Sequence, residues 1–258
     1  MSRRIALLAV VTISQSAGLV TIGLIVLASG EPMPDAEFIP YAAVAGLGGV
    51  CGLAAFYRAL AIGKMGVVAP ISSMAVLVPV TVGLATGDRP SGLQYAGACV
   101  GLAGIVLASR EAGEESGLDS RVATGAGLAL LSGLGFGSFF VAMDAAADYD
   151  PLWATLVNRV SSLSLACLAV LAFRPSYRGV VRRDLPVLMS IGVLEILANA
   201  AFALAATRGL LSITSILSSL YPVVTVFLAL LVLHERLHRT QALGAAAALV
   251  GVGLIAGG

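Results

Sequence analysis

The sequence predicts an all-α polytopic membrane protein, built as two inverted repeats of helices with about nine spans. The first observation behind this prediction is the composition. Of the 258 residues, 59% are hydrophobic and only 11% are charged, and the mean hydropathy is +0.99. A soluble domain carries about 25% charged residues, so this chain has too few to keep its surface in water. The other two observations are a succession of apolar runs and an internal duplication.

The apolar runs have the length of membrane helices. A spanning helix needs about 20 mostly apolar residues, and short loops join all the runs of this kind. The predicted spans are Ile5–Ala28, Ile39–Ile62, Gly66–Thr86, Leu93–Ser109, Val122–Met143, Leu152–Phe173, Leu185–Ala206, Leu210–Leu233 and Gln241–Ala256. The longest polar segment between them, Arg110–Arg121, predicts a hinge between two halves.

Loop charges predict the orientation of the chain in the membrane. Lys and Arg gather in alternate loops, such as the one that contains Arg182 and Arg183. Because positive loops stay in the cytoplasm, the N-terminus is expected inside and the C-terminus outside, in the cell (inner or plasma) membrane. The net charge of +1 and the lack of a basic run argue against a nucleic-acid partner.

Segments of the first half of the chain recur in the second half. In each of two segments an acid-Arg pair is followed at equal spacing by Gln and two Gly. Upstream, two further pairs of segments align, one of them on Pro79 and Pro222. The aligned pairs are GDRPSGLQYAGACVGLAG (87–104) with HERLHRTQALGAAAALVG (234–251), ISSMAVLVPV (71–80) with SILSSLYPVV (215–224), and SQSAGLVTIGLIVL (14–27) with NRVSSLSLACLAVL (158–171). The chain is therefore predicted to be a duplication.

The two predicted copies cross the membrane in opposite directions, because equivalent spans lie five apart, an odd number. We expect the first repeat in residues 1–110 and the second in residues 122–258. Inverted repeats are typical of secondary transporters, in which the solute site lies between the copies near the midplane.

The repeated pattern resembles a known family. Small residues, L-x-P or L-Y-P, an apolar run, an acid-Arg pair and Q-x-x-G-x-x-x-x-x-x-G are similar to the EamA repeat of the drug/metabolite transporter superfamily, above all in Leu217–Ala256. The resemblance implies ten spans, whereas the first copy here lacks its first helix. It also implies transport of a metabolite, amino acid or drug-like compound, either ion-coupled or facilitative. Lipid is the surrounding partner, a proton or cation could couple, and the chain could form a homodimer.

Two other functions compete with transport at this stage. HERLH, residues 234–238, matches the H-E-x-x-H pattern of zinc peptidases, but its counterpart in the first copy has no histidine. These two are the only histidines, so a third ligand would have to be a carboxylate. No metal, cofactor or enzymatic activity is therefore predicted. The missing helix leaves a non-transporting assembly or scaffold protein as the second alternative.

Polar groups in the middle of spans are candidates for binding or coupling, since ionisable groups are costly in the bilayer. Glu195 lies near the middle of its span, with Asn199 one turn later. It could titrate a proton, bind a substrate amine or serve structurally. Arg159, preceded by Asn158, could bind a substrate carboxylate, pair with Glu195 or extend to an interface. Gln15 is its counterpart in the other copy.

Hydroxyl groups and prolines form the second set of candidates. The hydroxyls could line a polar path or bond between helices. Pro79 and Pro222 are predicted to kink or break helices at equivalent positions, with a role in gating. The hydroxyl candidates are Ser72, Ser73, Ser215, Ser218, Ser219 and Tyr221. Tyr57 is interpreted as an interfacial anchor, and pairs such as Gly97 with Gly101 and Gly133 with Gly137 predict close helix packing.

Overall fold

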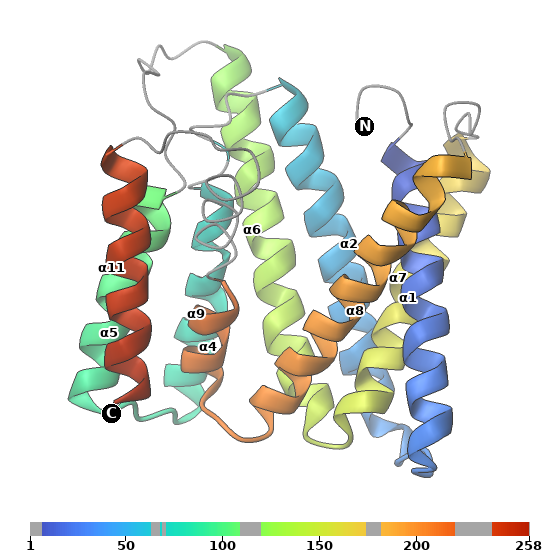
Figure 1. The fold of residues 1–258 in the computed structure, drawn as a ribbon, viewed down its shortest axis with the longest axis horizontal. Helices are drawn as coiled ribbons and strands as arrows, with labels where there is room; N and C mark the ends of the chain where they lie inside the picture. Colours follow the sequence, from blue (N-terminus) through green and yellow to red (C-terminus); the bar gives the residue numbers. More distant parts are fainter. Residues whose placement is uncertain are drawn as a thin grey trace. The chain divides into compact units, whose positions relative to one another are not determined.

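The computed structural model describes residues 7–62, 68, 71–108, 120–173, 182–219 and 239–257. Within these ranges the regular structure is α-helix and 3-10 helix, without strands (Figure 1). The α-helices are α1 (Leu7–Ser29), α2 (Ile39–Ile62), α4 (Leu77–Thr86), α5 (Gly92–Ala108), α6 (Ser120–Ala147), α7 (Pro151–Phe173), α8 (Leu185–Ala206), α9 (Leu211–Ser218) and α11 (Arg239–Ala256). Three 3-10 helices, η1 (Ala36–Phe38), η2 (Met74–Val76) and η3 (Arg182–Asp184), adjoin them.

Five of the described helices are long and apolar enough to cross a membrane. These stretches are Val10–Ser29, Ala36–Ile62, Gly125–Ala147, Pro151–Ala172 and Leu185–Ala206. Each coincides with a predicted span, which confirms the all-helical polytopic fold. The predicted spans Gly66–Thr86 and Leu210–Leu233 are described only in part.

Local sequence signals explain several helix boundaries. α5 begins with a capping box, in which Ser91 N–H donates to Gln94 Oε1 at 2.9 Å and Gln94 N–H donates to Ser91 Oγ at 3.2 Å. α7 begins at Pro151, and the Asp150 carboxylate accepts from Trp153 N–H at 2.7 Å. α4 ends at Gly87, whose φ of 118° belongs to the left-handed region that favours glycine.

The chain forms two compact units. Unit 1 comprises Met1–Val50 and Val141–Arg208, and unit 2 comprises Cys51–Phe140 and Gly209–Gly258. Each unit contains helices from both predicted repeats, so the boundaries of the compact units differ from those of the repeats. The repeat boundaries stay a prediction.

Unit 2 contains the antiparallel helix pair α5 and α11, which lie side by side (Figure 1). Their backbones meet at glycines: a Cβ on Gly97 would lie 2.7 Å from Gly251 O, and one on Gly104 would lie 2.7 Å from Gly244 O. Gly97 is the repeat counterpart of Gly244, and Gly104 is the counterpart of Gly251. The two contacts are therefore reciprocal, as a twofold relation between equivalent helices requires. The predicted close packing at Gly97 is confirmed.

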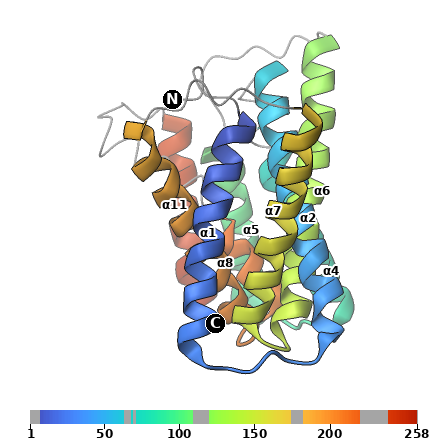
Figure 2. The ribbon, with the colours of Figure 1, turned by 90° about the vertical axis from the view of Figure 1, so that its right-hand side faces the viewer.

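Unit 1 shows the same reciprocity among α1, α2, α7 and α8. A Cβ on Gly192 would overlap the backbone carbonyl of Ser14, and one on Gly46 would overlap that of Asn158. Ser14 and Asn158 are repeat counterparts. Gly46 and Gly192 therefore make the same contact in the two copies. Both α7 and α8 pack against α1, and Figure 2 shows α8 crossing α1 with α7 beside them.

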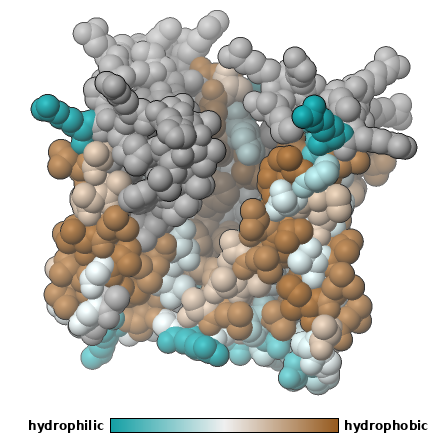
Figure 3. Space-filling model, in the orientation of Figure 1, coloured by the Kyte–Doolittle hydropathy of each residue, from teal (hydrophilic) through white to brown (hydrophobic). Residues whose placement is uncertain are grey.

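The outward surface of the helices is apolar. Large hydrophobic side chains are exposed there, among them Leu27, Leu171 and Leu194, and Figure 3 shows apolar surface over the helices. Exposed leucines along spans of this length are stable when the solvent is hydrocarbon, in agreement with a membrane location.

Candidate functional site

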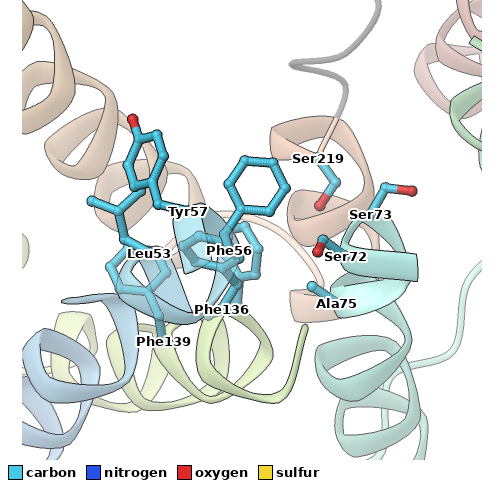
Figure 4. A pocket seen from close by; sticks show the side chains of 10 residues that line it. Leu53, Phe56, Tyr57, Ser72, Ser73, Ala75, Phe136, Phe139 and Ser219 are labelled. Carbon is cyan, nitrogen blue, oxygen red and sulfur yellow. The ribbon is translucent and has the colours of Figure 1, made fainter. Parts of the chain in front are cut away.

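A cavity of about 320 Å³ lies within unit 2. It is lined by Leu53, Phe56, Tyr57, Ser72, Ser73, Ala75, Phe136, Phe139, Phe140 and Ser219. None of these ten side chains is charged. Figure 4 shows the aromatic rings on one side of the cavity and the serines with Ala75 on the other.

The aromatic side of the cavity comes from two helices. Leu53, Phe56 and Tyr57 of α2 are spaced i, i+3, i+4, and so are Phe136, Phe139 and Phe140 of α6. This spacing places three side chains on one face of a helix. Phe139 and Phe140 pack edge to face with ring centroids 5.3 Å apart.

The serine side comes from the segment before α4 and from the end of α9. Ser72, fully buried, donates to the backbone carbonyl of Ala129 on α6 at 3.5 Å. Ser219 is also buried and follows directly after α9. The structure thus places three of the predicted hydroxyl candidates, Ser72, Ser73 and Ser219, at one cavity.

The other predicted hydroxyls have different surroundings. Ser215 is fully buried one turn before Ser219, and its Oγ has no hydrogen-bond partner among the described residues. Ser218 is exposed and does not line the cavity. Tyr221, Pro222 and the HERLH segment lie outside the described residues.

Pro79 is buried in the first turn of α4, directly after the 3-10 turn η2. A proline there interrupts no α-helical hydrogen bond within α4, because the first N–H groups of a helix have no intrahelical partner. The break predicted at this proline therefore takes the form of a 3-10 to α transition. Its role in gating stays a prediction.

Unit 1 contains a buried polar cluster centred on Arg159 of α7. The side chain is only 1% exposed. Its Nη1 donates to Oε1 of Gln15 and forms an ion pair with Oε1 of Glu195 at 3.4 Å. Ser162 Oγ also donates to Gln15 Oε1, at 3.1 Å, and Gln15 Nε2 lies 3.5 Å from Glu195 Oε1. Three predicted candidates, from three helices, meet at this point.

Two open interpretations of Arg159 are decided by this geometry. Since the guanidinium is buried, it does not extend to an interface, and it does pair with Glu195. Asn158 is buried, and its backbone carbonyl faces Gly46. Asn199, one turn after Glu195, is half-buried.

The sequence does not predict the aromatic lining as part of a site, and it indicates only an interfacial anchor at Tyr57. The chain has 8 Phe and 6 Tyr, and five of these 14 aromatics line one cavity. The i, i+3, i+4 spacing in two separate spans was a usable signal. Apolar faces of membrane helices meet lipid as readily as a cavity, so spacing alone could not place these rings.

Comparisons with known proteins give a consistent result. The EamA-like transporter family matches residues 123–257, which is more than half of the chain. A protein of known crystal structure superposes with a TM-score of 0.83, over 99% of this chain and 91% of that one. At 19% identity it supports the fold alone. No curated protein matches the chain in sequence. The family match confirms the resemblance carried by the repeated pattern, and the chain belongs to the EamA-like transporter family of membrane proteins.

Proposed function

We propose that this chain carries a small organic solute, such as a metabolite, an amino acid or a drug-like compound, across the cell membrane by alternating access. The solute's apolar body occupies the cavity in unit 2. The observation that carries the proposal is the lining of this cavity, aromatic on one side and hydroxyl-bearing on the other. Its volume of about 320 Å³ falls in the range of small-molecule sites, roughly 300–1,000 Å³.

The side chains that line the cavity determine which chemical groups of the solute can bind there. Aromatic rings offer flat apolar surfaces on which a ring or a branched aliphatic group stacks. The hydroxyls of Ser72 and Ser219 can exchange hydrogen bonds with one polar group of the solute. Because no lining side chain is charged, an ionic group in this cavity would have no counter-charge and would be excluded.

Alternating access is supported by the reciprocal contacts inside each unit. Helices of the two copies meet through close contacts between glycines and the facing backbone, which leave few side chains to lock one arrangement. A duplicated, inverted module has two similar arrangements available, one open to each side. The cycle can be facilitative or coupled to a proton or cation.

The test is transport by purified protein in proteoliposomes, with a panel of radiolabelled neutral aromatic and aliphatic solutes. Phe136→Ala and Phe56→Ala should each raise the half-saturating concentration about tenfold or more, since each removes a stacking surface. Tyr95→Ala is the matched control, because Tyr95 is an exposed aromatic on α5 away from the lining. It should leave uptake unchanged.

Two results would contradict the proposal. Uptake equal to that of empty liposomes for every solute would exclude transport. Equal effects of Phe136→Ala and Tyr95→Ala would exclude the cavity as the solute site.

A further inference from the structure

The guanidinium of Arg159 is only partly used by its neighbours. Nη1 makes both side-chain contacts, to Gln15 and Glu195, whereas Nε and Nη2 have no hydrogen-bond partner among the described residues. All of these atoms are buried. Buried polar groups are normally satisfied, and a guanidinium presents its Nε and Nη2 donors as a fork that matches a carboxylate. The unpaired edge formed by Nε and Nη2 therefore fits an acceptor group with two oxygens, such as a carboxylate.

The neighbours of Arg159 hold the guanidinium in a fixed orientation. Gln15 Oε1 accepts from both Arg159 Nη1 and Ser162 Oγ, which ties α1 to α7. Gly18 lets α1 approach closely, because a Cβ there would meet Arg159 Cζ and Nε at 3.2 Å. A donor fork held in this way is preorganised for an anion.

Glu195 neutralises Arg159 only loosely. The ion pair uses one carboxylate oxygen at 3.4 Å, longer than the roughly 2.7–2.9 Å of a strong charge-assisted hydrogen bond. The Glu195 side chain is 37% exposed, whereas that of Arg159 is 1% exposed. A proton can therefore reach Glu195 more easily than it can reach the guanidinium.

The duplication indicates where an anion would fit. Gly46 and Gly192 make equivalent contacts, so Glu195, three residues after Gly192, corresponds to Gly49 in the first copy. Gln15 corresponds to Arg159 in the same way. Glu195 lies 3.5 Å from Gln15 in the structure. By the same equivalence we expect Gly49, which has no side chain, to face Arg159.

We propose that Arg159 binds the carboxylate of an organic anion through its Nε and Nη2 edge, and that Glu195 takes up one proton when the anion binds. Before binding, the charges of Arg159 and Glu195 cancel. A bound carboxylate adds one negative charge, and protonation of Glu195 restores neutrality in the low-dielectric interior. The inference rests on the proposed transport only for its physiological meaning, since binding is measured without it.

Few other charges can interfere with this exchange. α1 has no titratable side chain, Arg159 is the only charged residue of α7, and Glu195 is the only charged residue of α8. The only charged residue of α2 is Arg58, twelve residues after Gly46, and its other titratable residues are Tyr41, Cys51 and Tyr57. Cys167 of α7 is exposed, eight residues after Arg159. In η3, which packs on the start of α8, the charged residues Arg182, Arg183 and Asp184 precede Glu195 by eleven residues or more, about 16 Å along a helix.

The experiment is equilibrium binding to the full chain in detergent, by titration calorimetry in two buffers that differ in ionisation enthalpy. The probes are acetate, butyrate and phenylacetate, each paired with its neutral amide. Each carboxylate should bind at least tenfold more tightly than its amide. One proton should be taken up per anion, so affinity should rise up to about tenfold for each unit that pH falls, until Glu195 is protonated in the free protein.

Variants separate the roles of the two residues. Glu195→Gln should bind the carboxylates at the high-affinity limit with no dependence on pH. Arg159→Gln should lose the preference for carboxylate over amide. If this single variant fails to fold, the double variant Arg159→Gln/Glu195→Gln replaces it, because it keeps the cluster neutral. Ser164→Ala is the control, because Ser164 is exposed on α7 and bonds only its own helix at Val160 O.

The inference is overturned if carboxylates and amides bind equally, if neither wild type nor Glu195→Gln binds any carboxylate of the panel, or if Glu195→Gln keeps the pH dependence. If the wild-type protein transports neutral solutes but binds carboxylates no better than amides, the anion site is excluded and the proposed function stands. If the protein binds carboxylates with the expected pH dependence but transports no solute, the proposed function is excluded and the anion site stands.

Discussion

Asp88 connects two parts of unit 2 that lie far apart in the sequence. Its Oδ2 accepts from the backbone N–H of Ser212 at 2.9 Å and from Ser212 Oγ at 2.7 Å. Ser212 is in the first turn of α9, whose own N-cap residue, Leu210, offers no side-chain acceptor. Asp88 therefore caps α9 from outside the helix, where a carboxylate also interacts favourably with the helix dipole. The acid of the repeated acid-Arg pair has a packing role in this copy.

Replacing Asp88 by alanine should destabilise the protein by about 1–2 kcal/mol, because α9 loses its capping acceptor. Thermal unfolding of detergent-solubilised protein, followed by far-ultraviolet circular dichroism, measures the change. Asp35→Ala is the matched control: Asp35 is the N-cap of η1 but makes no side-chain capping bond. An Asp88→Ala midpoint no lower than that of Asp35→Ala would show that the cap contributes little.

At the scale of helices, the close approach of α5 and α11 depends on the absence of side chains. Gly104 faces the backbone of Ala248, and Gly251 faces that of Gly101. In lipid, where hydrophobic side chains gain nothing by leaving their solvent, close backbone contact supplies the attraction between helices. The glycine pattern in these two segments predicts close packing. Of the other predicted pair, Gly137 packs closely, since a Cβ there would lie 2.9 Å from Ala75 O, whereas Gly133 makes only ordinary contact at 3.7 Å with Ala75.

Gly104→Ala should lower stability by about 1–3 kcal/mol, because the new Cβ meets backbone atoms of α11 that cannot move aside. Gly253→Ala provides the comparison on α11 itself, since nothing lies within 4 Å of a Cβ there. That variant should match or slightly exceed the wild type, given the higher helix propensity of alanine. Both are measured by chemical unfolding in mixed micelles, and equal midpoints would argue against glycine-mediated packing of this pair.

At the scale of the whole molecule, the duplication appears as the same contacts made twice inside each compact unit. Gly192 meets Ser14 as Gly46 meets Asn158, and the glycines of α5 and α11 meet reciprocally. The polar centre departs from this symmetry, because the second copy has Arg159 and Glu195 where the first has Gln15 and Gly49. Equivalent contacts therefore maintain the fold, and the departures from equivalence mark the candidate binding chemistry.

Because they make the same contact, Gly46→Ala and Gly192→Ala should destabilise the protein to a similar extent, by about 1–3 kcal/mol each. Gly23→Ala, on α1 with nothing within 4 Å, should be nearly neutral. Melting temperatures of the three variants in one detergent test the equivalence. A large loss in one of the first two variants and none in the other would be evidence against a shared contact.

The sequence by itself indicated that lipid surrounds this protein, located its five membrane-length helices and predicted the duplication. Each of these depends on composition or on residues close together in the chain, so a sum or an alignment is enough to find it. The sequence also identified Arg159, Gln15 and Glu195 as candidate site residues, because a polar group is conspicuous inside an apolar run.

Only the tertiary structure decided which side chains meet. Phe56 and Phe136 line one cavity with Ser219, and Asp88 caps a helix 124 residues away. The guanidinium of Arg159 bonds its neighbours through Nη1 and leaves Nε and Nη2 without a hydrogen-bond partner among the described residues. Such outcomes depend on how each helix is rotated about its axis and on which backbones come into contact. In a chain this apolar, the pattern along any one span leaves that rotation open, because lipid and protein accept the same side chains.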